Sequence, residues 1–395
     1  MAIQISPDEP RGARLLRGAL GALGLAAAVL IALPVVGALV PWLPVVGVLG
    51  SSFAGHMPFE FAVLGAVVLA VSLAARARVR PAARCGLVAG AITLVGALVV
   101  LSCQLSFSLG RGAEIGVGDV VRGGRPMPPP DRTETFAVVQ GQPLRAGIWL
   151  PRGESPVPRP AVIWVHGGGF VEGSRDEQRG IYRYLADRGY PVISVDYRLA
   201  PPVRWRDATE DVVCAMSWLT GHAAEYGVDP ARLVLAGGSA GGSLTLNVAY
   251  GLAAGSITSS CPGPAPAAPA AVAGFYPAAD LAGVYRDNGM YGYARRSARA
   301  YLGGSPRQVP DRYAYASALA RVRPGLMPTL LVTGGNDHLI FERRVREVAD
   351  RLRAAGDPVR YDVFPFGDHA FDAAGIGNAF SRSVLLDFLH EHAPL

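Results

Sequence analysis

The sequence predicts an α/β protein, in which a mostly parallel sheet with helices on both faces follows an all-helical membrane region. Strand and helix signals alternate from about residue 135 to the C-terminus, which is typical of parallel sheets. Two glycine-rich runs each follow a short apolar strand, where ligand-binding loops of such sheets lie. Residues 1–110 differ in composition, because long apolar runs dominate them.

The N-terminal region contains three apolar runs, which cover Gly18–Gly50, Phe61–Ala75 and Gly86–Phe107. A helix needs about twenty apolar residues to cross the hydrocarbon core of a bilayer. We therefore expect about three transmembrane helices in residues 1–110, whereas a helical hairpin in the first run gives four. A cleaved signal peptide is the alternative for the first run alone, and the third run argues against it.

The arginines of this region predict its orientation. Arg11, Arg14 and Arg17 precede the first run, and further arginines lie in the segment 76–84 between the second and third runs. The positive-inside rule places both segments in the cytoplasm. Three spans then carry the rest of the chain to the outer side of the cell membrane.

The remainder divides into a tether and one globular domain. Residues 111–134 are rich in glycine and proline, which is typical of a linker. Residues 135–395 form a unit of the usual size for an α/β domain. It opens with an antiparallel hairpin, Thr135–Gln140 with Leu144–Leu150. The expected parallel strands and helices then alternate: Val192–Val195, a helix near Asp207–Leu219, Leu233–Ala236, a helix after residue 239, Ala271–Phe275, Thr329–Val332, a helix near Glu342–Ala355, Tyr361–Phe364 and a helix near Phe380–His390.

The run from Gly237 to Gly241 has the pattern G-x-S-x-G and follows the strand Leu233–Ala236. This pattern exposes a serine on a sharp turn between a strand and a helix. Small neighbours let the strand and the helix approach each other without a side-chain clash. We therefore predict that Ser239 is a nucleophile.

A second run, His166–Phe170, follows the strand-like stretch Ala161–Val165 and reads H-G-G-G-F. Glycines at 168 and 169 leave their N–H groups uncovered. With the N–H of Ala240, at the start of the following helix, these groups predict an oxyanion hole. Taken alone, the run at 237–241 could be an ordinary glycine-rich turn and the run at 166–170 a flexible loop without function. The presence of both runs, each after a strand, argues against these structural interpretations.

The order serine, acid, histidine that this motif implies selects the two remaining catalytic candidates. Asp337 follows the strand Thr329–Val332 in a glycine-rich turn, and His369 lies in the loop after Tyr361–Phe364. We predict that His369 takes the serine proton and that Asp337 orients and stabilises its ring. Asp362 and Asp368 are the alternative acids. His338 directly follows Asp337 in the same turn, so His369 is the preferred base.

Other features predict structural roles. Asp196 and Arg198 are expected to brace the oxyanion loop through an ion pair. The dipeptide Asp229–Pro230 has the form of a helix start. Cys214 and Cys261 are expected to be free thiols, although an extracellular location would allow them to pair.

The insertion 281–325, rich in tyrosine and arginine, lies before the strand that leads to Asp337 and is expected to form a lid. The sequence holds no motif for a metal site. No cofactor is expected. The net charge of +6 is concentrated in the N-terminal region, and no basic stripe predicts nucleic-acid binding.

Four segments give the chain a clear resemblance to α/β-hydrolases of the hormone-sensitive-lipase and bacterial carboxylesterase type: His166–Phe170, Asp196–Pro201, Gly237–Gly242 and His369–Asp372. The resemblance covers about residues 135–395. It implies an α/β-hydrolase fold and a serine acyl-hydrolase with Ser239, His369 and Asp337 as its triad. The chain departs from the family pattern at Gly238, where an acid is common, and at Pro202, where glutamate is common.

The expected function is a membrane-anchored carboxylic ester hydrolase that acts on small-molecule or lipid esters through an acyl-serine intermediate. Acyl transfer to a lipid or sugar hydroxyl by the same triad is the alternative within enzymes. A non-catalytic binding protein on a hydrolase scaffold is the alternative of a different class. The sequence does not give the substrate, the acyl length or the oligomeric state.

Overall fold

The computed structural model describes residues 11–76, 80–121, 127–153, 155–259 and 261–395. The chain forms two compact units, Met1–Ser106 and Phe107–Leu395, which we describe separately.

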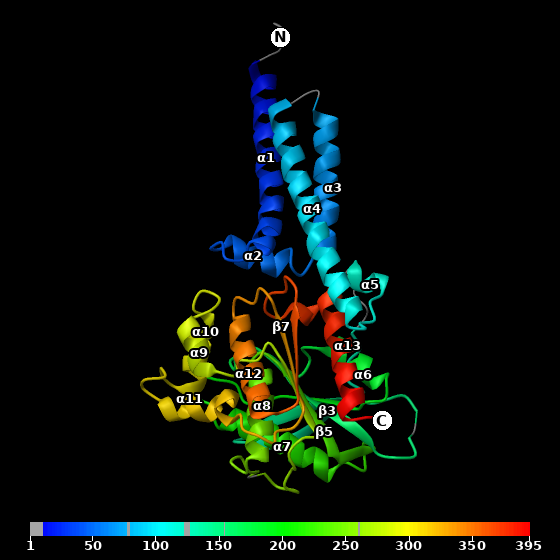
Figure 1. Ribbon diagram of the computed structural model, residues 1–395, viewed down its shortest axis with the longest axis vertical. Helices are drawn as coiled ribbons and strands as arrows, with labels where there is room; N and C mark the ends of the chain where they lie inside the picture. The colour runs from blue at the N-terminus through cyan, green and yellow to red at the C-terminus, as the bar shows by residue number, and fades with distance from the viewer. Residues whose placement is uncertain (1–10, 77–79, 122–126, 154, 260) are drawn as a thin grey trace. The chain divides into compact units, whose positions relative to one another are not determined.

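The first unit is helical (Figure 1). Its elements are α1 (Arg11–Leu39), α2 (Val46–Phe53), α3 (Pro58–Ala75) and the greater part of α4 (Arg80–Gly110). By length and composition, three segments of the described chain can cross a membrane: Gly21–Leu39, Pro58–Ala75 and Ala82–Gly110. The helix α2 has 8 residues, too few for a span, so the first apolar run does not form a hairpin of two spans.

Glycines let these helices approach closely. A Cβ atom at Gly65 of α3 would lie 2.5 Å from the backbone nitrogen of Leu94 on α4. Many large apolar side chains point away from the helix contacts and are exposed, among them Leu30, Val71 and Val95. Small residues at the contacts and apolar side chains outside are typical of helices that pack in lipid.

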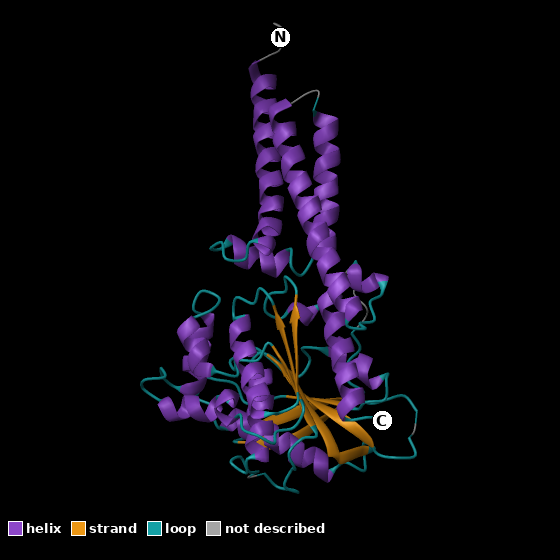
Figure 2. Ribbon diagram, viewed as in Figure 1, coloured by secondary structure: helices purple, strands orange, loops and turns teal. Residues whose placement is uncertain are grey.

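The second unit contains one eight-stranded sheet (Figure 2). Its strands are β1 (Arg132–Val139), β2 (Gln142–Trp149), β3 (Arg159–Val165), β4 (Val192–Val195), β5 (Val228–Gly238), β6 (Ala271–Phe275), β7 (Thr329–Gly334) and β8 (Val359–Phe364). Their order is β1-β2-β4-β3-β5-β6-β7-β8. The hairpin β1–β2 and the β2–β4 pair are antiparallel, and every other pair is parallel.

The central strands are continuous apolar runs because both of their faces are covered. Two helices, α6 (Arg179–Ala186) and α13 (Gly375–His392), pack against each other on one face. The other face carries α7 (Asp207–Gly221), α8 (Ala240–Ala253) and α12 (Glu342–Ala355) (Figure 1). The predicted fold, a mostly parallel sheet with helices on both faces, is confirmed.

Residues 107–121, which precede the sheet, contact α13. This segment contains the short helix α5 (Val117–Val120), and its Asp119 accepts a hydrogen bond from Arg382 at 2.9 Å. The backbone N–H of Glu114 donates to Ser383 Oγ. The strand β1 begins at Arg132, before the expected start of the hairpin.

The insertion between β6 and β7 is helical. It contains α9 (Leu281–Asp287), α10 (Tyr293–Leu302), α11 (Pro310–Ala316) and the 3-10 helix η1 (Ala318–Arg321). The buried face of α10 carries Ala294, Ala298 and Tyr301, whereas its arginines are exposed. A second 3-10 helix, η2 (Phe371–Ala373), precedes α13.

Two local predictions are wrong. Asp229 and Pro230 lie inside β5 and begin no helix. Val228 pairs with Arg159 and Leu233 pairs with Ala161, so β3 holds this segment at both of its ends, and the register shifts between the two pairs.

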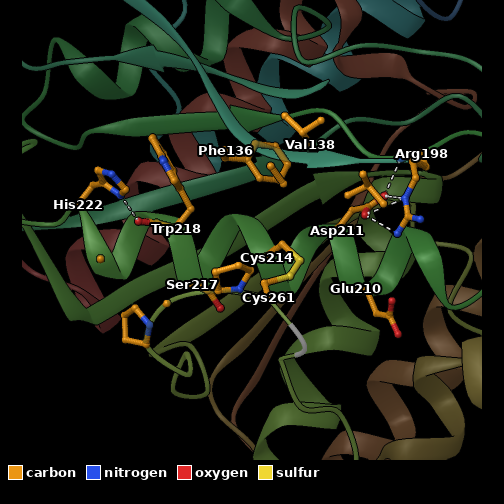
Figure 3. Close-up of a pocket in the computed structure, with 16 residues that line it drawn as sticks. Phe136, Val138, Arg198, Glu210, Asp211, Cys214, Ser217, Trp218, His222 and Cys261 are labelled. Atoms are coloured by element: carbon orange, nitrogen blue, oxygen red, sulfur yellow. Dashed lines mark hydrogen bonds and ion pairs between the residues drawn. A yellow bond between two sulfur atoms is a disulfide. The ribbon is translucent and has the colours of Figure 1, made fainter. Parts of the chain in front are cut away.

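The expected free thiols of Cys214 and Cys261 are instead joined in a disulfide. The bond links α7 to the segment after α8, at the wall of a pocket between β1 and α7 (Figure 3). The other two cysteines, Cys85 and Cys103, are free and exposed.

Candidate active site

Ser239 lies at the turn between β5 and α8. Its backbone has φ 54° and ψ −118°, a conformation that is costly for a residue with a side chain. Two glycines make the turn sterically feasible. A Cβ at Gly237 would lie 2.6 Å, and one at Gly241 2.0 Å, from the carbonyl oxygen of Val165 on β3. The turn therefore presses the start of α8 against β3 and holds the serine in a strained, fixed position.

His369 lies in the loop after β8 and faces this serine. Its Nε2 atom is 2.9 Å from Ser239 Oγ, although 130 residues separate the two in sequence. The opposite ring nitrogen, Nδ1, is 2.8 Å from Asp337 Oδ2. The backbone N–H of His369 donates to Asp368 Oδ1, which fixes the loop below the ring.

Asp337 follows β7 and is held by its own loop. Its Oδ1 atom accepts hydrogen bonds from the N–H groups of Leu339 and Ile340, each at 2.8 Å. This leaves Oδ2 directed at His369. The structure thus brings Ser239, His369 and Asp337 into one hydrogen-bonded chain.

The alternative acids do not contact the Nδ1 atom of His369. Asp368 instead accepts hydrogen bonds from the backbone of His338 and from that of His369, and it pairs with the His338 ring at 3.2 Å. Asp362 lies in β8, where it pairs with Arg360 and Arg111.

The predicted oxyanion residues lie next to Ser239. Gly168 and Gly169 have φ values of 97° and 59°, which favour glycine, and the loop begins directly after β3. Ala240 is the first residue of α8. Among the described residues, the N–H groups of these three residues form no hydrogen bond. They are therefore free to bind an oxygen that gains negative charge.

Asp196 and Arg198 do not pair with each other. Asp196 accepts from the backbone and the guanidinium of Arg175, in the segment that follows the oxyanion loop. Arg198 forms a buried pair with Asp211 of α7 at 2.7 Å (Figure 3). Between them, Tyr197 stacks on the ring of His166 with centroids 4.3 Å apart. Asp196 and Tyr197 thus contact the oxyanion loop and the segment after it, whereas Arg198 is bound to α7.

Electrostatics favour the protonated form of His369. Burial lowers its pKa, but the charge and the hydrogen bond of Asp337 outweigh burial, so the pKa is raised above 6.5. Asp372 lies beneath this site, and burial raises its pKa to about 6. Tyr276 connects the two: its hydroxyl donates to Asp372 Oδ1 at 2.5 Å, and its ring meets His369 edge-on at 4.7 Å.

A narrow cavity of about 20 Å³ opens beside Ser239. Its walls come from the oxyanion loop, from α8, from the loop of Asp337 and from the insertion helices α9 and α10: Gly169, Phe170, Ser239, Ala240, Ala278, Leu281, Val284, Tyr293, Ala294, Ser297, Ala298, Leu339 and Ile340. A cavity of this volume holds about one water molecule.

Glu177 and Tyr276 were not predicted from the sequence as residues of the site, and neither was the burial of Asp372 beneath it. Glu177 Oε2 accepts a hydrogen bond from Gly167 N at 2.7 Å. Tyr276 directly follows β6, and a side chain at the carboxyl end of a parallel strand is the signal that could have indicated it. Nothing in the pattern distinguishes Glu177 from the other acidic residues of its loop.

No group of histidine, cysteine, aspartate and glutamate side chains within the described ranges can hold a metal ion.

Known proteins resemble this chain in sequence. The "probable carboxylic ester hydrolase LipM" of Mycobacterium tuberculosis is 29% identical over 240 residues, which cover 59% of this chain and 54% of that protein. Esterase LipC of the same organism is 29% identical over 238 residues, covering 57% and 56%. The chain therefore spans about half the length of these curated relatives.

Solved structures of esterases are also similar to this chain. An esterase of Thermogutta terrifontis, Est2 with propionate bound, has a TM-score of 0.55 and 26% identity, covering 69% of this chain and 97% of that one. A bacterial heroin esterase has a TM-score of 0.57 and 25% identity, covering 66% and 84%. A family model described as alpha/beta hydrolase fold matches residues 162–373, more than half of the chain. The chain therefore belongs to the α/β-hydrolase fold family.

Proposed function

We propose that this protein is a membrane-anchored carboxylic ester hydrolase, with Ser239 as nucleophile, His369 as general base and Asp337 as the acid that orients it. The observation that carries the proposal is the chain of two short hydrogen bonds, 2.9 Å and 2.8 Å, through the two nitrogens of His369. This is the arrangement that activates a serine hydroxyl. The ester hydrolases among the similar proteins support it.

In the acylation step, Ser239 Oγ attacks the ester carbonyl carbon and its proton passes to His369 Nε2. Asp337 stabilises the resulting imidazolium, in agreement with the raised pKa of His369. When the tetrahedral intermediate collapses, the bond to the alcohol oxygen breaks. His369 returns its proton to that oxygen, and an acyl ester remains on Ser239.

In the deacylation step, a water molecule replaces the alcohol. Its oxygen attacks the acyl carbon while its proton passes to His369. The bond to Ser239 Oγ then breaks, His369 returns the proton to Oγ, and the carboxylic acid leaves.

The negative charge of both tetrahedral intermediates falls on the former carbonyl oxygen. We assign its stabilisation to the N–H groups of Gly168, Gly169 and Ala240, which form no other hydrogen bond among the described residues. The strained backbone at Ser239 and the positive φ values of the two glycines keep these donors in place before the substrate arrives.

The cavity beside Ser239 supports a preference for short acyl groups. Its volume of about 20 Å³ leaves no room for a long chain unless α9 and α10 move, which would make the insertion a lid. The similar esterase of Thermogutta terrifontis has been solved with the short-chain acids propionate and butyrate bound, which supports short acyl groups although both are larger than this cavity.

Two features support anchoring with the hydrolase unit outside the cell. Three apolar helices can cross a bilayer, and the arginines that flank them favour a cytoplasmic N-terminus. The disulfide between Cys214 and Cys261 fits an oxidising compartment, because cytosolic thiols are kept reduced.

The activity is tested with p-nitrophenyl esters of graded acyl length and a fluorophosphonate probe, in detergent-solubilised wild-type protein and Ser239→Ala. We expect hydrolysis and labelling to disappear together in the variant, and hydrolysis by the wild type to be fastest for short acyl groups. A folded wild type that neither reacts with the probe nor cleaves any ester would refute the proposal.

The orientation is tested by a C-terminal tag in intact cells. External protease should remove the tag, and a tag cut only after the membrane is broken would place the hydrolase unit in the cytoplasm.

A further inference from the structure

The surroundings of Ser239 differ on its two sides. On one side lies the apolar cavity, whose walls include Phe170, Leu281 and Ile340. On the other lies His369, whose Nε2 atom is 2.9 Å from Ser239 Oγ. Because His369 must protonate the departing alcohol, the alcohol oxygen has to lie within hydrogen-bond reach of Nε2. The cavity then receives the acyl group, and the alcohol extends along the other side.

Glu177 lies near Ser239 but is not one of the residues that line the cavity. A Cβ atom at Gly167 would lie 3.0 Å from Glu177 Oε1 and 3.4 Å from Ser239 Cβ, so one point beside Gly167 is in contact distance of both residues. Neither Gly167 nor Glu177 belongs to the cavity walls. The residue Glu177 is exposed as a whole, but its carboxylate is partly withdrawn from water and its Oε2 atom is fixed by Gly167 N at 2.7 Å.

No cation of the described chain pairs with Glu177. The two arginines nearest to it in sequence have carboxylates of their own: Arg175 pairs with Asp196 at 2.6 Å, and Arg179 with Asp176 at 3.0 Å. The other charged groups that act on Glu177 are Asp372, which repels its charge, and His369, which attracts it. The alcohol side of the site is therefore negative when Glu177 is ionised and His369 is neutral.

We infer that Glu177 selects esters whose alcohol carries a positive charge, such as an amino alcohol or a quaternary ammonium alcohol. The inference rests on the proposed ester hydrolysis and adds the class of leaving group. Glu177 takes no part in the bond changes: it attracts the ammonium group while His369 protonates the alcohol oxygen. A fixed carboxylate beside the nucleophile favours a nearby cation by Coulomb attraction, and it disfavours anionic alcohols to a similar degree.

The state of Glu177 sets the assay conditions. Desolvation of the carboxylate and repulsion from Asp372 raise the pKa of Glu177, against the hydrogen bond from Gly167 and the attraction of His369, to about 7. Measurements near pH 8.5, roughly one and a half units above that value, keep the group ionised.

The test compares acetylcholine with 3,3-dimethylbutyl acetate, in which a carbon atom replaces the charged nitrogen at nearly the same shape. Both esters give the same acetyl-enzyme, so the ratio of their kcat/KM values reports only on the leaving group. We expect the full-length wild type to prefer the charged ester roughly tenfold at low salt, and this preference to fall as salt screens the attraction.

The variant E177Q keeps an oxygen for the N–H of Gly167 but removes the charge, and it should lose most of the preference. The matched control is E172Q, which removes a charge from the same loop. Glu172 accepts from Tyr293 OH at 2.9 Å, on the cavity side, so its loss should leave the ratio unchanged. The leaving group of p-nitrophenyl acetate carries no cationic group. Hydrolysis of this ester therefore reports whether each variant is still active.

Three results would overturn the inference: equal kcat/KM values for the two esters in the wild type, a preference that survives in E177Q, or a preference lost equally in E172Q. Each leaves the proposed function standing as long as the wild type cleaves p-nitrophenyl acetate and Ser239→Ala does not. Failure of that cleavage instead rejects the ester hydrolase itself.

Discussion

The disulfide between Cys214 and Cys261 gives a prediction with a calculable size. The two cysteines are 47 residues apart in sequence, and their Cα atoms are 5.4 Å apart in the fold. The double variant C214A/C261A removes the covalent link between α7 and the segment after α8, and only non-covalent contacts then hold the two together. The cross-link restricts the unfolded chain, so its loss should lower the free energy of unfolding.

The magnitude follows from the entropy of closing a loop of this length. For about 47 residues, the chain-entropy relation gives a stabilisation of about 4 kcal/mol at 25 °C. A unit of this size changes its melting temperature by about 2 °C per kcal/mol. We therefore expect the hydrolase unit of C214A/C261A to melt roughly 8 °C below that of the wild type.

The assay follows tryptophan fluorescence and residual hydrolysis of a short p-nitrophenyl ester during heating of the full-length protein in detergent. The matched control is C85A/C103A, which removes the two free, exposed cysteines of the first unit. Dithiothreitol should lower the melting temperature of the wild type and of this control, but not that of C214A/C261A. The reasoning fails if C214A/C261A melts within about 1 °C of the wild type, or if reductant leaves the wild type unchanged.

Three further predictions concern the catalytic site and its support. Asp337→Asn should lower kcat by about 10³- to 10⁴-fold with little change in KM, because the amide no longer holds the required tautomer of His369; a loss below tenfold would speak against its role. The value of kcat/KM should rise with pH through a pKa above 6.5, because the base must be neutral and Asp337 stabilises its charged form; a midpoint below 6.5 in a pH profile would contradict this. Gly241→Ala should destabilise the hydrolase unit by roughly 3 kcal/mol in a melting experiment, because its Cβ would lie 2.0 Å from a backbone oxygen, whereas Gly110→Ala, with nothing within 4 Å, should not destabilise it.

Local sequence determined much of this fold because strands buried on both faces are short apolar runs between turn signals. The strands Val192–Val195 and Ala271–Phe275 have the bounds expected from sequence. The glycine-rich runs at 166–170 and 237–242 also fall where predicted, directly at the ends of β3 and β5. Both motifs are local: the backbone conformation they need is one that only glycine or a strained elbow serine supplies.

Local signals failed where a distant partner overrode them. Asp229–Pro230 carries the marks of a helix start, yet this segment lies within β5, between residues 228 and 233, which both pair with β3. The expected extracellular location allows the cysteines at 214 and 261 to pair, but free thiols are the preferred expectation, because sequence separation says nothing about the 5.4 Å between their Cα atoms.

The sequence by itself determined the fold class, the nucleophile motif and the candidates for base and acid, because each depends on residue types within a short segment. Only the tertiary structure decided that Asp337 rather than Asp368 reaches the Nδ1 atom of His369, since both lie in loops at the same edge of the sheet. It also decided that Glu177 lies close to Ser239 without lining the cavity. Such distances depend on how whole strands and loops pack, and no short segment of the chain encodes them.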